Sequence, residues 1–222
     1  MSDRAAVRAG WCAEEVQREL PGVRLLVCEV EPAGETALTA ASPQQLRARL
    51  RELSDRFRGA RAVGVRREAV PAAYRVFFRQ IGLDPDAAPT PLEAAVRERM
   101  LMGGFPSAGL LADALLIALL DTGVPVWALD ADAVAGELGI RASVEAEPFG
   151  RDRAAAALPG GRLVLADDTS ALAILFGEIA PGHLPRARAR RLLLFALQVE
   201  GVPALYAEEA LWNAASALET RW

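Results

Sequence analysis

The spacing of apolar residues predicts strands and helices within the first sixty positions. A β-type apolar run over residues 22–30, bounded by prolines, predicts a sheet strand, and the preceding residues 5–20 are predicted to be helical. After the strand, apolar positions recur at spacings of four, three and four. This pattern predicts an amphipathic helix with Ser42 as N-cap and Pro43 at N1, which ends at Gly59 and buries Leu46, Leu50, Leu53 and Phe57.

Three more helices follow in the pattern. The first covers residues 72–80, and the second begins at a capping box in which Thr90 is the cap and Glu93 stands at N3. Residues 110–120 are the most apolar part of the chain, yet they fall short of the roughly 20 residues that a membrane-spanning helix needs. They predict a buried core helix that begins near Ser107 and ends at a glycine C-cap, Gly123.

The second half of the chain is β-rich. Residues 124–129 and 163–166 are predicted strands, and Asp167 to Ser170 is a predicted hairpin turn before a returning strand over 171–176. A packing helix is predicted over 204–218. There is no internal repeat and no long Ser/Gly linker, so residues 1–222 are interpreted as one α/β (α+β) domain.

Composition and charge limit the classes of function. The chain has 222 residues, 52% of them hydrophobic, and a net charge of -4, which is typical of an ordinary soluble globular protein. All 25 basic residues are Arg. The acidic balance excludes coating of DNA, RNA or a membrane by bulk charge, so any RNA contact is local. The N-terminal residues lack the apolar region of a signal peptide, which predicts a cytoplasmic protein.

The metal-binding side chains are few. Cys12 and Cys28 are the only cysteines and His183 is the only histidine, so the usual zinc sites cannot be assembled within one chain. His183 lies in a turn-like Pro-Gly-His-Leu-Pro segment and is predicted to be an exposed loop residue. The acidic pairs Asp130/Asp132 and Asp167/Asp168 stand at strand ends, where turn structure is favoured over a metal site. No metal and no cofactor is predicted.

The order of several motifs resembles a known family. The motifs are Tyr74-Arg75, Gly82-Leu-Asp-Pro85, Thr90-Pro-Leu-Glu-Ala94, Arg99, Gly104-Phe-Pro106, Asp113, Gly123-Val-Pro-Val-Trp-Ala-Leu-Asp130, Gly136-Glu-Leu-Gly-Ile-Arg141 and Gly161-Arg-Leu-Val-Leu-Ala-Asp167. Together they are similar to the B3/B4 editing domain of the bacterial phenylalanyl-tRNA synthetase beta subunit, and in particular to free-standing B3/B4 proteins. The resemblance spans residues 70–203 and more loosely both ends.

The resemblance implies a fold and an activity. The fold is an α/β domain with a central mixed sheet and flanking helices. The activity is binding of the acceptor end of a mischarged tRNA and hydrolysis of its aminoacyl ester, without a metal or cofactor. An activated ester needs only a positioned water and a few hydrogen bonds to the developing oxyanion. A complete synthetase is excluded, because the chain is too short and has no recognisable ATP-binding motifs of that class.

The positions that match the editing pocket have become large and apolar. The family pattern has Asn, His, Gly and Glu where this chain has Leu116, Trp127, Ile174 and Leu193. Either these side chains fill the old pocket and leave an inactive scaffold that binds RNA, a small ligand or a protein, or the protein edits another amino acid. In the second case Asp113, Asp121, Glu178 or backbone amides would hold the water. A solvent-open cavity lined by Trp127, Asp113 and Ser107 would support editing.

One basic cluster interrupts the acidic chain. It contains Arg186, Arg188, Arg190 and Arg191, and Arg75 is a weaker companion. The cluster is the best candidate for a contact with tRNA phosphates, and the alternative is a solvated surface without a ligand. The working hypothesis is an editing protein that acts in trans on aminoacyl-tRNA, and the competing one is the inactive scaffold.

Overall fold

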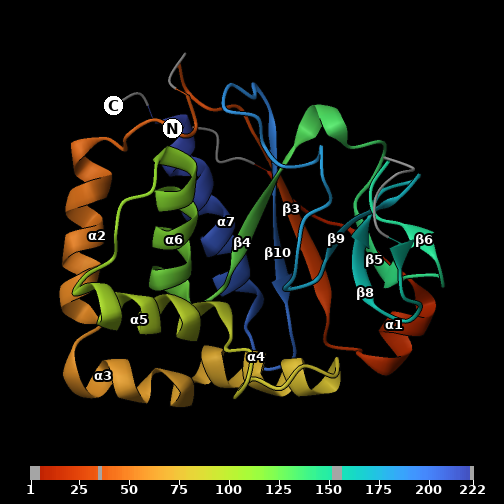
Figure 1. The fold of residues 1–222 in the computed structure, drawn as a ribbon, viewed down its shortest axis with the longest axis horizontal. Coiled ribbons are helices and arrows are strands. Elements are labelled where there is room, and N and C mark those ends of the chain that lie inside the picture. The colour runs from red at the N-terminus through yellow and green to blue at the C-terminus, as the bar shows by residue number, and fades with distance from the viewer. Residues whose placement is uncertain (1–5, 35–36, 152–156, 221–222) are drawn as a thin grey trace.

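The fold combines two four-stranded sheets with helices (Figure 1), and the computed structural model describes residues 6–34, 37–151 and 157–220. Sheet A is antiparallel throughout and has the order β1 (Val7–Ala9), β3 (Arg24–Val30), β10 (Leu192–Gln198) and β4 (Val126–Asp130). Sheet B has the order β2 (Trp11–Cys12), β5 (Gly139–Ala142), β8 (Leu163–Ala166) and β9 (Ala171–Ile174). Only its β2–β5 pair is parallel. A two-stranded pair joins β6 (Glu147–Pro148) and β7 (Ala157–Leu158).

The α/β (α+β) class is confirmed, but the strands form separate sheets and not one central mixed sheet. The helical prediction for residues 5–20 is confirmed for the short α1 (Glu14–Glu19) and is wrong before it, where β1 and β2 lie. Gly10 carries the chain from sheet A to sheet B. A Cβ on Gly10 would lie 2.5 Å from the Leu138 carbonyl oxygen, so only glycine fits this close approach.

The helices cover sheet A on one side and run below it (Figure 1). In that view α2 (Gln44–Arg56), α6 (Leu110–Thr122) and α7 (Ala204–Glu219) stand beside sheet A, and α6 and α7 pack closely together. Along the lower edge lie α3 (Gly59–Gly64), the short 3-10 helix η1 (Val65–Arg67), α4 (Ala69–Gln80) and α5 (Pro91–Met102). A second 3-10 helix, η2 (Ala131–Ala133), follows β4.

The helix ends test the capping predictions. The capping box at Thr90 and Glu93 is confirmed, and so is the left-handed C-cap at Gly123 (φ 78°). The predicted cap at Ser42 is wrong, because Pro43 occupies the N-cap position of α2 and the buried Ser42 hydroxyl has no partner among the described residues. That helix also ends at Arg56, three residues before Gly59.

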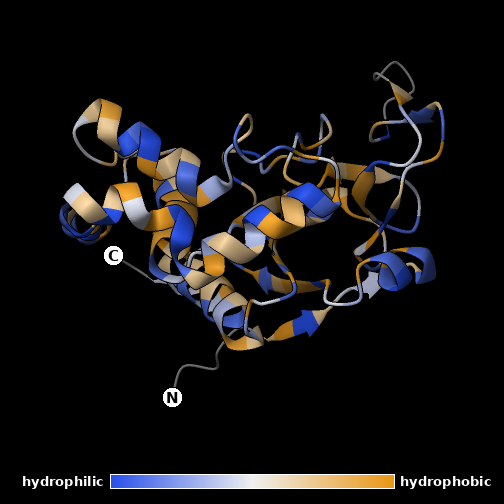
Figure 2. Cartoon of the chain, turned by 90° about the horizontal axis from the view of Figure 1, so that it is seen from below, coloured by the Kyte–Doolittle hydropathy of each residue, from blue (hydrophilic) through white to orange (hydrophobic). Residues whose placement is uncertain are grey.

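The core is continuous through both sheets. Buried apolar residues of sheet A, part of sheet B and the helices form one large cluster, to which β10 contributes six buried positions. A smaller second cluster contains Phe149, Leu158, Val164, Ala171 and Ala180. Helix α7 packs against β10, while Phe195 and Leu197 on the same strand line a small cavity with Ile174 of β9. Helix α1 differs from these apolar core elements, because almost all of its residues are hydrophilic (Figure 2). No helix within the described ranges is long and apolar enough to cross a membrane.

Candidate functional site

Aromatic side chains fill the region where the editing pocket is expected. Trp127 on β4 stacks on Phe195 on β10, with ring centroids 5.4 Å apart and 17° between the planes. Trp127 also forms a T-shaped pair with Phe176, with ring centroids 5.2 Å apart. The cavity that remains has a volume of about 10 Å³, which is no more than the room one water molecule needs. The space left here is far too small for the aminoacyl group that an editing pocket must hold.

Phe176 is the centre of this packing, and the sequence did not single it out. Its ring also contacts Tyr74, Phe77 and Phe78 on α4, at centroid distances of 5.9, 5.8 and 4.8 Å. The backbone of Phe176 has a φ of 60°, a region that L-residues other than Asn and Asp rarely adopt. The surrounding aromatic rings hold the residue in that conformation. The only sequence signal for it was an aromatic residue at the end of a predicted strand.

The structure brings together only some of the predicted pocket residues. Trp127 and Ile174 line the small cavity, and Leu193 lies on β10 two positions before Phe195 and therefore on the same face of the strand. Glu178 is exposed in the turn after β9, where its backbone carbonyl accepts from the Ile174 amide at 2.9 Å. Leu116 lies on α6 and does not line the cavity.

Asp113 stabilises the turn that precedes α6. Its side chain is completely buried, and one carboxylate oxygen accepts from the Ser107 hydroxyl at 2.5 Å while the other accepts from the Ala108 amide at 2.8 Å. These bonds fix the turn before Leu110, which is where α6 begins in place of the predicted Ser107. Asp121 accepts from Arg49 at 2.7 Å and from Arg56 at 3.1 Å. Both carboxylates are therefore engaged away from the cavity.

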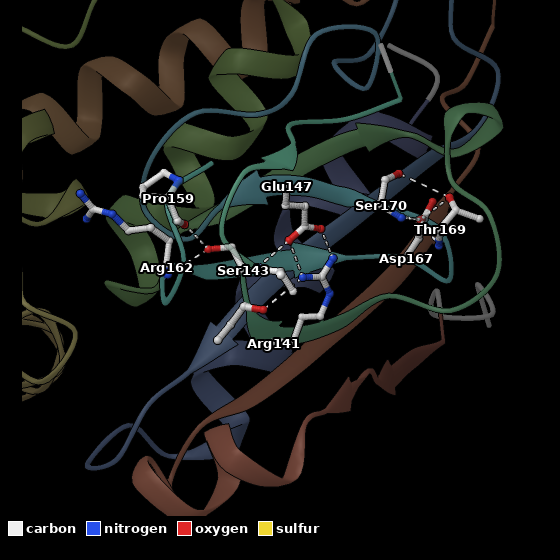
Figure 3. A network of polar contacts seen from close by, with 10 residues as sticks. Arg141, Ser143, Glu147, Pro159, Arg162, Asp167, Thr169 and Ser170 are labelled. Atoms are coloured by element: carbon white, nitrogen blue, oxygen red, sulfur yellow. Dashed lines mark hydrogen bonds and ion pairs between the residues drawn. The ribbon is translucent and has the colours of Figure 1, made fainter. Parts of the chain in front are cut away.

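Asp167 organises the predicted hairpin turn (Figure 3). One carboxylate oxygen accepts from the amides of Thr169 and Ser170, and the other accepts from the Ala135 amide at 2.8 Å and from Arg151 at 2.7 Å. Burial alone would raise the pKa of Asp167, but the N–H donors outweigh it and hold the pKa below its usual range. No three metal-ligating side chains converge within the described part of the chain.

The arginine cluster between β9 and β10 divides into paired and free side chains. Arg186 donates to Asp130 at 2.6 Å, and this bond lowers the pKa of Asp130 below its usual range. Arg191 pairs with Glu29 at 3.1 Å. Arg188 and Arg190 are exposed, and neither forms an ion pair with any described residue. Two guanidinium groups thus remain available to an anion.

Arg75 is not available in the same way. Its side chain is 12% exposed and bridges α4 to the following segment, with bonds to Glu93 at 2.8 Å, to Asp86 at 2.5 Å and to the Pro85 carbonyl at 3.2 Å. The carboxylates neutralise its charge. Arg75 therefore positions α4 against α5, and this explains the Tyr74-Arg75 motif without a phosphate contact.

His183 is buried, so the prediction of an exposed loop residue is wrong. The side chain is 3% exposed, Nδ1 lies 3.2 Å from the Pro181 carbonyl oxygen, and Nε2 has no partner among the described residues. The loop is held down because the His183 carbonyl accepts from the Asp130 amide at 3.0 Å. Gly150, with a φ of 84°, leaves room for the ring, since a Cβ there would lie 3.3 Å from it.

An open groove lies next to the closed cavity, and no sequence motif predicted it. Its volume is about 600 Å³, and it runs between α1, the end of α4 and the β5–β8–β9 side of sheet B. Ile174 and Leu175 form part of the lining of both the groove and the small cavity. The polar lining residues are Glu15, Glu19, Gln80 and Arg162, and the apolar ones include Val16, Leu20, Ile81, Leu83 and Leu163.

The wall of the groove near Arg162 is fixed by a polar network (Figure 3). The Ser143 hydroxyl donates to the Pro159 carbonyl at 2.6 Å and accepts from the Arg162 amide at 3.0 Å. Arg141 forms a bidentate pair with Glu147 beside it. Figure 3 shows the Arg162 side chain extending away from this network, so its backbone is fixed while its guanidinium is free.

The chain was compared with protein-family models and with curated proteins. No protein-family model matches the chain, and no curated protein matches it at a significant level. The function is therefore argued from the closed cavity, the free arginines and the groove.

Proposed function

We propose that the chain is a free-standing B3/B4-type module that binds the acceptor end of tRNA and does not hydrolyse an ester in the pocket region that Trp127 occupies. The observation that carries the proposal is the packing of Trp127 against Phe195 and Phe176, which leaves about 10 Å³ of space. The ordered motifs between residues 70 and 203 supply the link to tRNA.

The chemistry of ester hydrolysis explains why this packing argues against editing there. Hydrolysis requires room for the aminoacyl group, a positioned water and hydrogen-bond donors for the oxyanion. The lining of the small cavity is apolar apart from the indole nitrogen of Trp127, and the buried Asp113 is committed to the turn before α6. A binding role needs none of these groups.

The free guanidinium groups of Arg188 and Arg190 are the proposed contact with the phosphates of the acceptor end. Arginine binds phosphate through paired hydrogen bonds, and each neutralised phosphate contributes to a salt-dependent affinity. Arg186 and Arg191 are already paired with carboxylates, so they contribute less.

The test is a panel of labelled aminoacyl-tRNAs on which binding and ester lifetime are both measured. We expect binding that weakens as salt rises, and an ester lifetime equal to that without protein. The variant R188Q/R190Q should lower the magnitude of the salt slope by about 1 to 2 and weaken binding to all sequences alike. The matched control is R47Q/R51Q, which removes two exposed, unpaired arginines from α2.

Absence of tRNA binding would overturn the proposal. Release of one amino acid from the panel would instead support the second candidate, which is editing in trans. The observation that favours this second candidate is the open groove that shares Ile174 and Leu175 with the closed cavity.

A further inference from the structure

The groove carries unpaired charges of both signs on different walls. Glu15 and Glu19 lie four residues apart on α1, which places them on one face of that helix. Arg162 belongs to a different wall, immediately before β8. No ion pair within the described residues involves any of the three, so the two carboxylates lie more than 4 Å from the guanidinium.

The surface between these charges is aliphatic. It is formed by Val16 of α1 and Leu20 just after it, by Ile81 and Leu83 after α4, and by Leu163 with Ile174 of sheet B, and no aromatic ring belongs to the lining. A volume of about 600 Å³ is within the range of roughly 300–1,000 Å³ that is common for small-molecule sites.

This arrangement is complementary to one kind of small molecule. A primary ammonium group matches two carboxylates, a carboxylate or another anion matches the guanidinium, and an aliphatic side chain matches the floor. An α-amino acid carries all three on a single carbon atom. The three charged side chains are exposed, so they stay hydrated when the groove is empty and no unpaired charge is buried.

We infer that this groove binds an aliphatic α-amino acid unit, with its ammonium group at Glu15 and Glu19 and its side chain on Val16, Leu163 and Ile174. The unit is either a free amino acid, whose carboxylate then meets Arg162, or the acyl group of an ester, whose carboxyl carries no charge. The inference does not rest on the tRNA proposal, since Arg188 and Arg190 belong to the loop between β9 and β10 and do not line the groove.

The test is calorimetric titration of the purified protein with three probes: L-leucine, L-leucinamide and 4-methylpentanoate. Leucinamide keeps the ammonium and the side chain without a charged carboxyl, and 4-methylpentanoate lacks the ammonium. We expect saturable binding of at least one of the two ammonium probes and a much weaker interaction with 4-methylpentanoate. The variant E15Q/E19Q should raise the Kd about ten-fold or more, as the loss of charge-assisted hydrogen bonds does.

Two matched controls use neighbouring residues of α1. Glu14→Gln changes the same charge on an exposed residue that does not line the groove, and it should leave the Kd within about two-fold. Arg18→Gln is the corresponding control for Arg162→Gln. All the substituted side chains are exposed, so far-UV circular dichroism should report an unchanged fold.

The two sources of the ligand give different results. If leucine binds more tightly than leucinamide and Arg162→Gln removes the difference, the ligand is the free amino acid. If leucinamide binds at least as well as leucine and Arg162→Gln changes neither Kd, the ligand is an esterified acyl group. The inference is overturned if neither ammonium probe binds saturably, if E15Q/E19Q binds as well as the unmodified protein, or if 4-methylpentanoate binds as tightly as the tighter of the two ammonium probes. Each of these results is independent of whether tRNA binds.

Discussion

Tyr74 connects the α4 layer to sheet A through one hydroxyl. Its side chain is 1% exposed, and its hydroxyl donates to the Leu197 carbonyl at 2.6 Å. Burial raises the pKa of Tyr74 far above its usual range, so the hydroxyl stays protonated and remains a donor at neutral pH. The same ring contacts Phe176, which links Tyr74 to the closed cavity.

Replacing Tyr74 with Phe tests this connection. The change keeps the ring and removes the donor, so we expect the free energy of unfolding to fall by about 1 to 2 kcal/mol. Urea unfolding at neutral pH measures it. The control is Tyr206→Phe, which alters an exposed ring at the start of α7 and should change stability by less than about 0.5 kcal/mol. Equal effects of the two substitutions would contradict the assigned role of the Tyr74 hydroxyl.

At the scale of helices and strands, local chemistry predicted most of the elements. The capping box at Thr90 and the glycine at 123 fix helix ends through bonds within a few residues, and these signals can be read from sequence. The prediction of a single helix over residues 5–20 is wrong for β1 and β2, because the choice between helix and strand in that part depends on distant partners. Gly139 admits the Trp11 indole, since a Cβ on it would lie 1.9 Å from the ring.

The ion pair between Arg141 and Glu147 joins β5 to β6, and its contribution to stability depends on pH. The Arg141 side chain, 24% exposed, donates to Glu147, and this bond lowers the pKa of Glu147 below its usual range against the opposing effect of burial. A carboxyl with a lowered folded pKa adds stability above its unfolded pKa of about 4.3 and loses that contribution as pH falls through the folded pKa.

Replacing Glu147 with Gln should therefore reduce stability most at neutral pH. We expect the difference in unfolding free energy between the unmodified protein and Glu147→Gln to be constant above about pH 5.5 and to shrink steadily below about pH 4.3. Denaturant unfolding across pH 3 to 7 measures it. Glu98→Gln, an exposed and unpaired position on α5, is the control and should show a small difference at every pH. A difference for Glu147→Gln that grew as the pH fell would refute this account.

At the scale of the whole molecule, the candidate sites differ in how far the sequence could predict them. The order of the motifs predicted that Trp127 and Ile174 belong to one pocket, and both residues line the small cavity. The groove was not predictable, because its walls come from α1, α4 and sheet B, which lie far apart in sequence. The prediction that His183 is exposed was wrong for a similar reason. Turn composition is local, whereas its burial depends on Gly150 and on the end of β4.

The two sheets share one core, and this predicts that they unfold together. Sheet A and sheet B are joined covalently at Gly10, between β1 and β2, and by the contact of Trp127 on β4 with Phe176 after β9. Cys28 reports on sheet A, because it is completely buried at the centre of β3 and burial raises the pKa of its thiol to about 11. A buried and protonated thiol is unreactive.

A variant with Cys12→Ser leaves Cys28 as the only thiol, so each labelling event then reports on β3. At pH 8 we expect no measurable reaction of Cys28 with an aromatic disulfide reagent in the native protein. As denaturant is added, the fraction labelled in a short pulse should follow the far-UV circular dichroism transition with the same midpoint, because β3 becomes accessible only when the shared core is lost. A labelling midpoint well below the circular dichroism midpoint would mean that sheet A opens while sheet B and the helices remain folded, and the chain would then consist of two cooperative units.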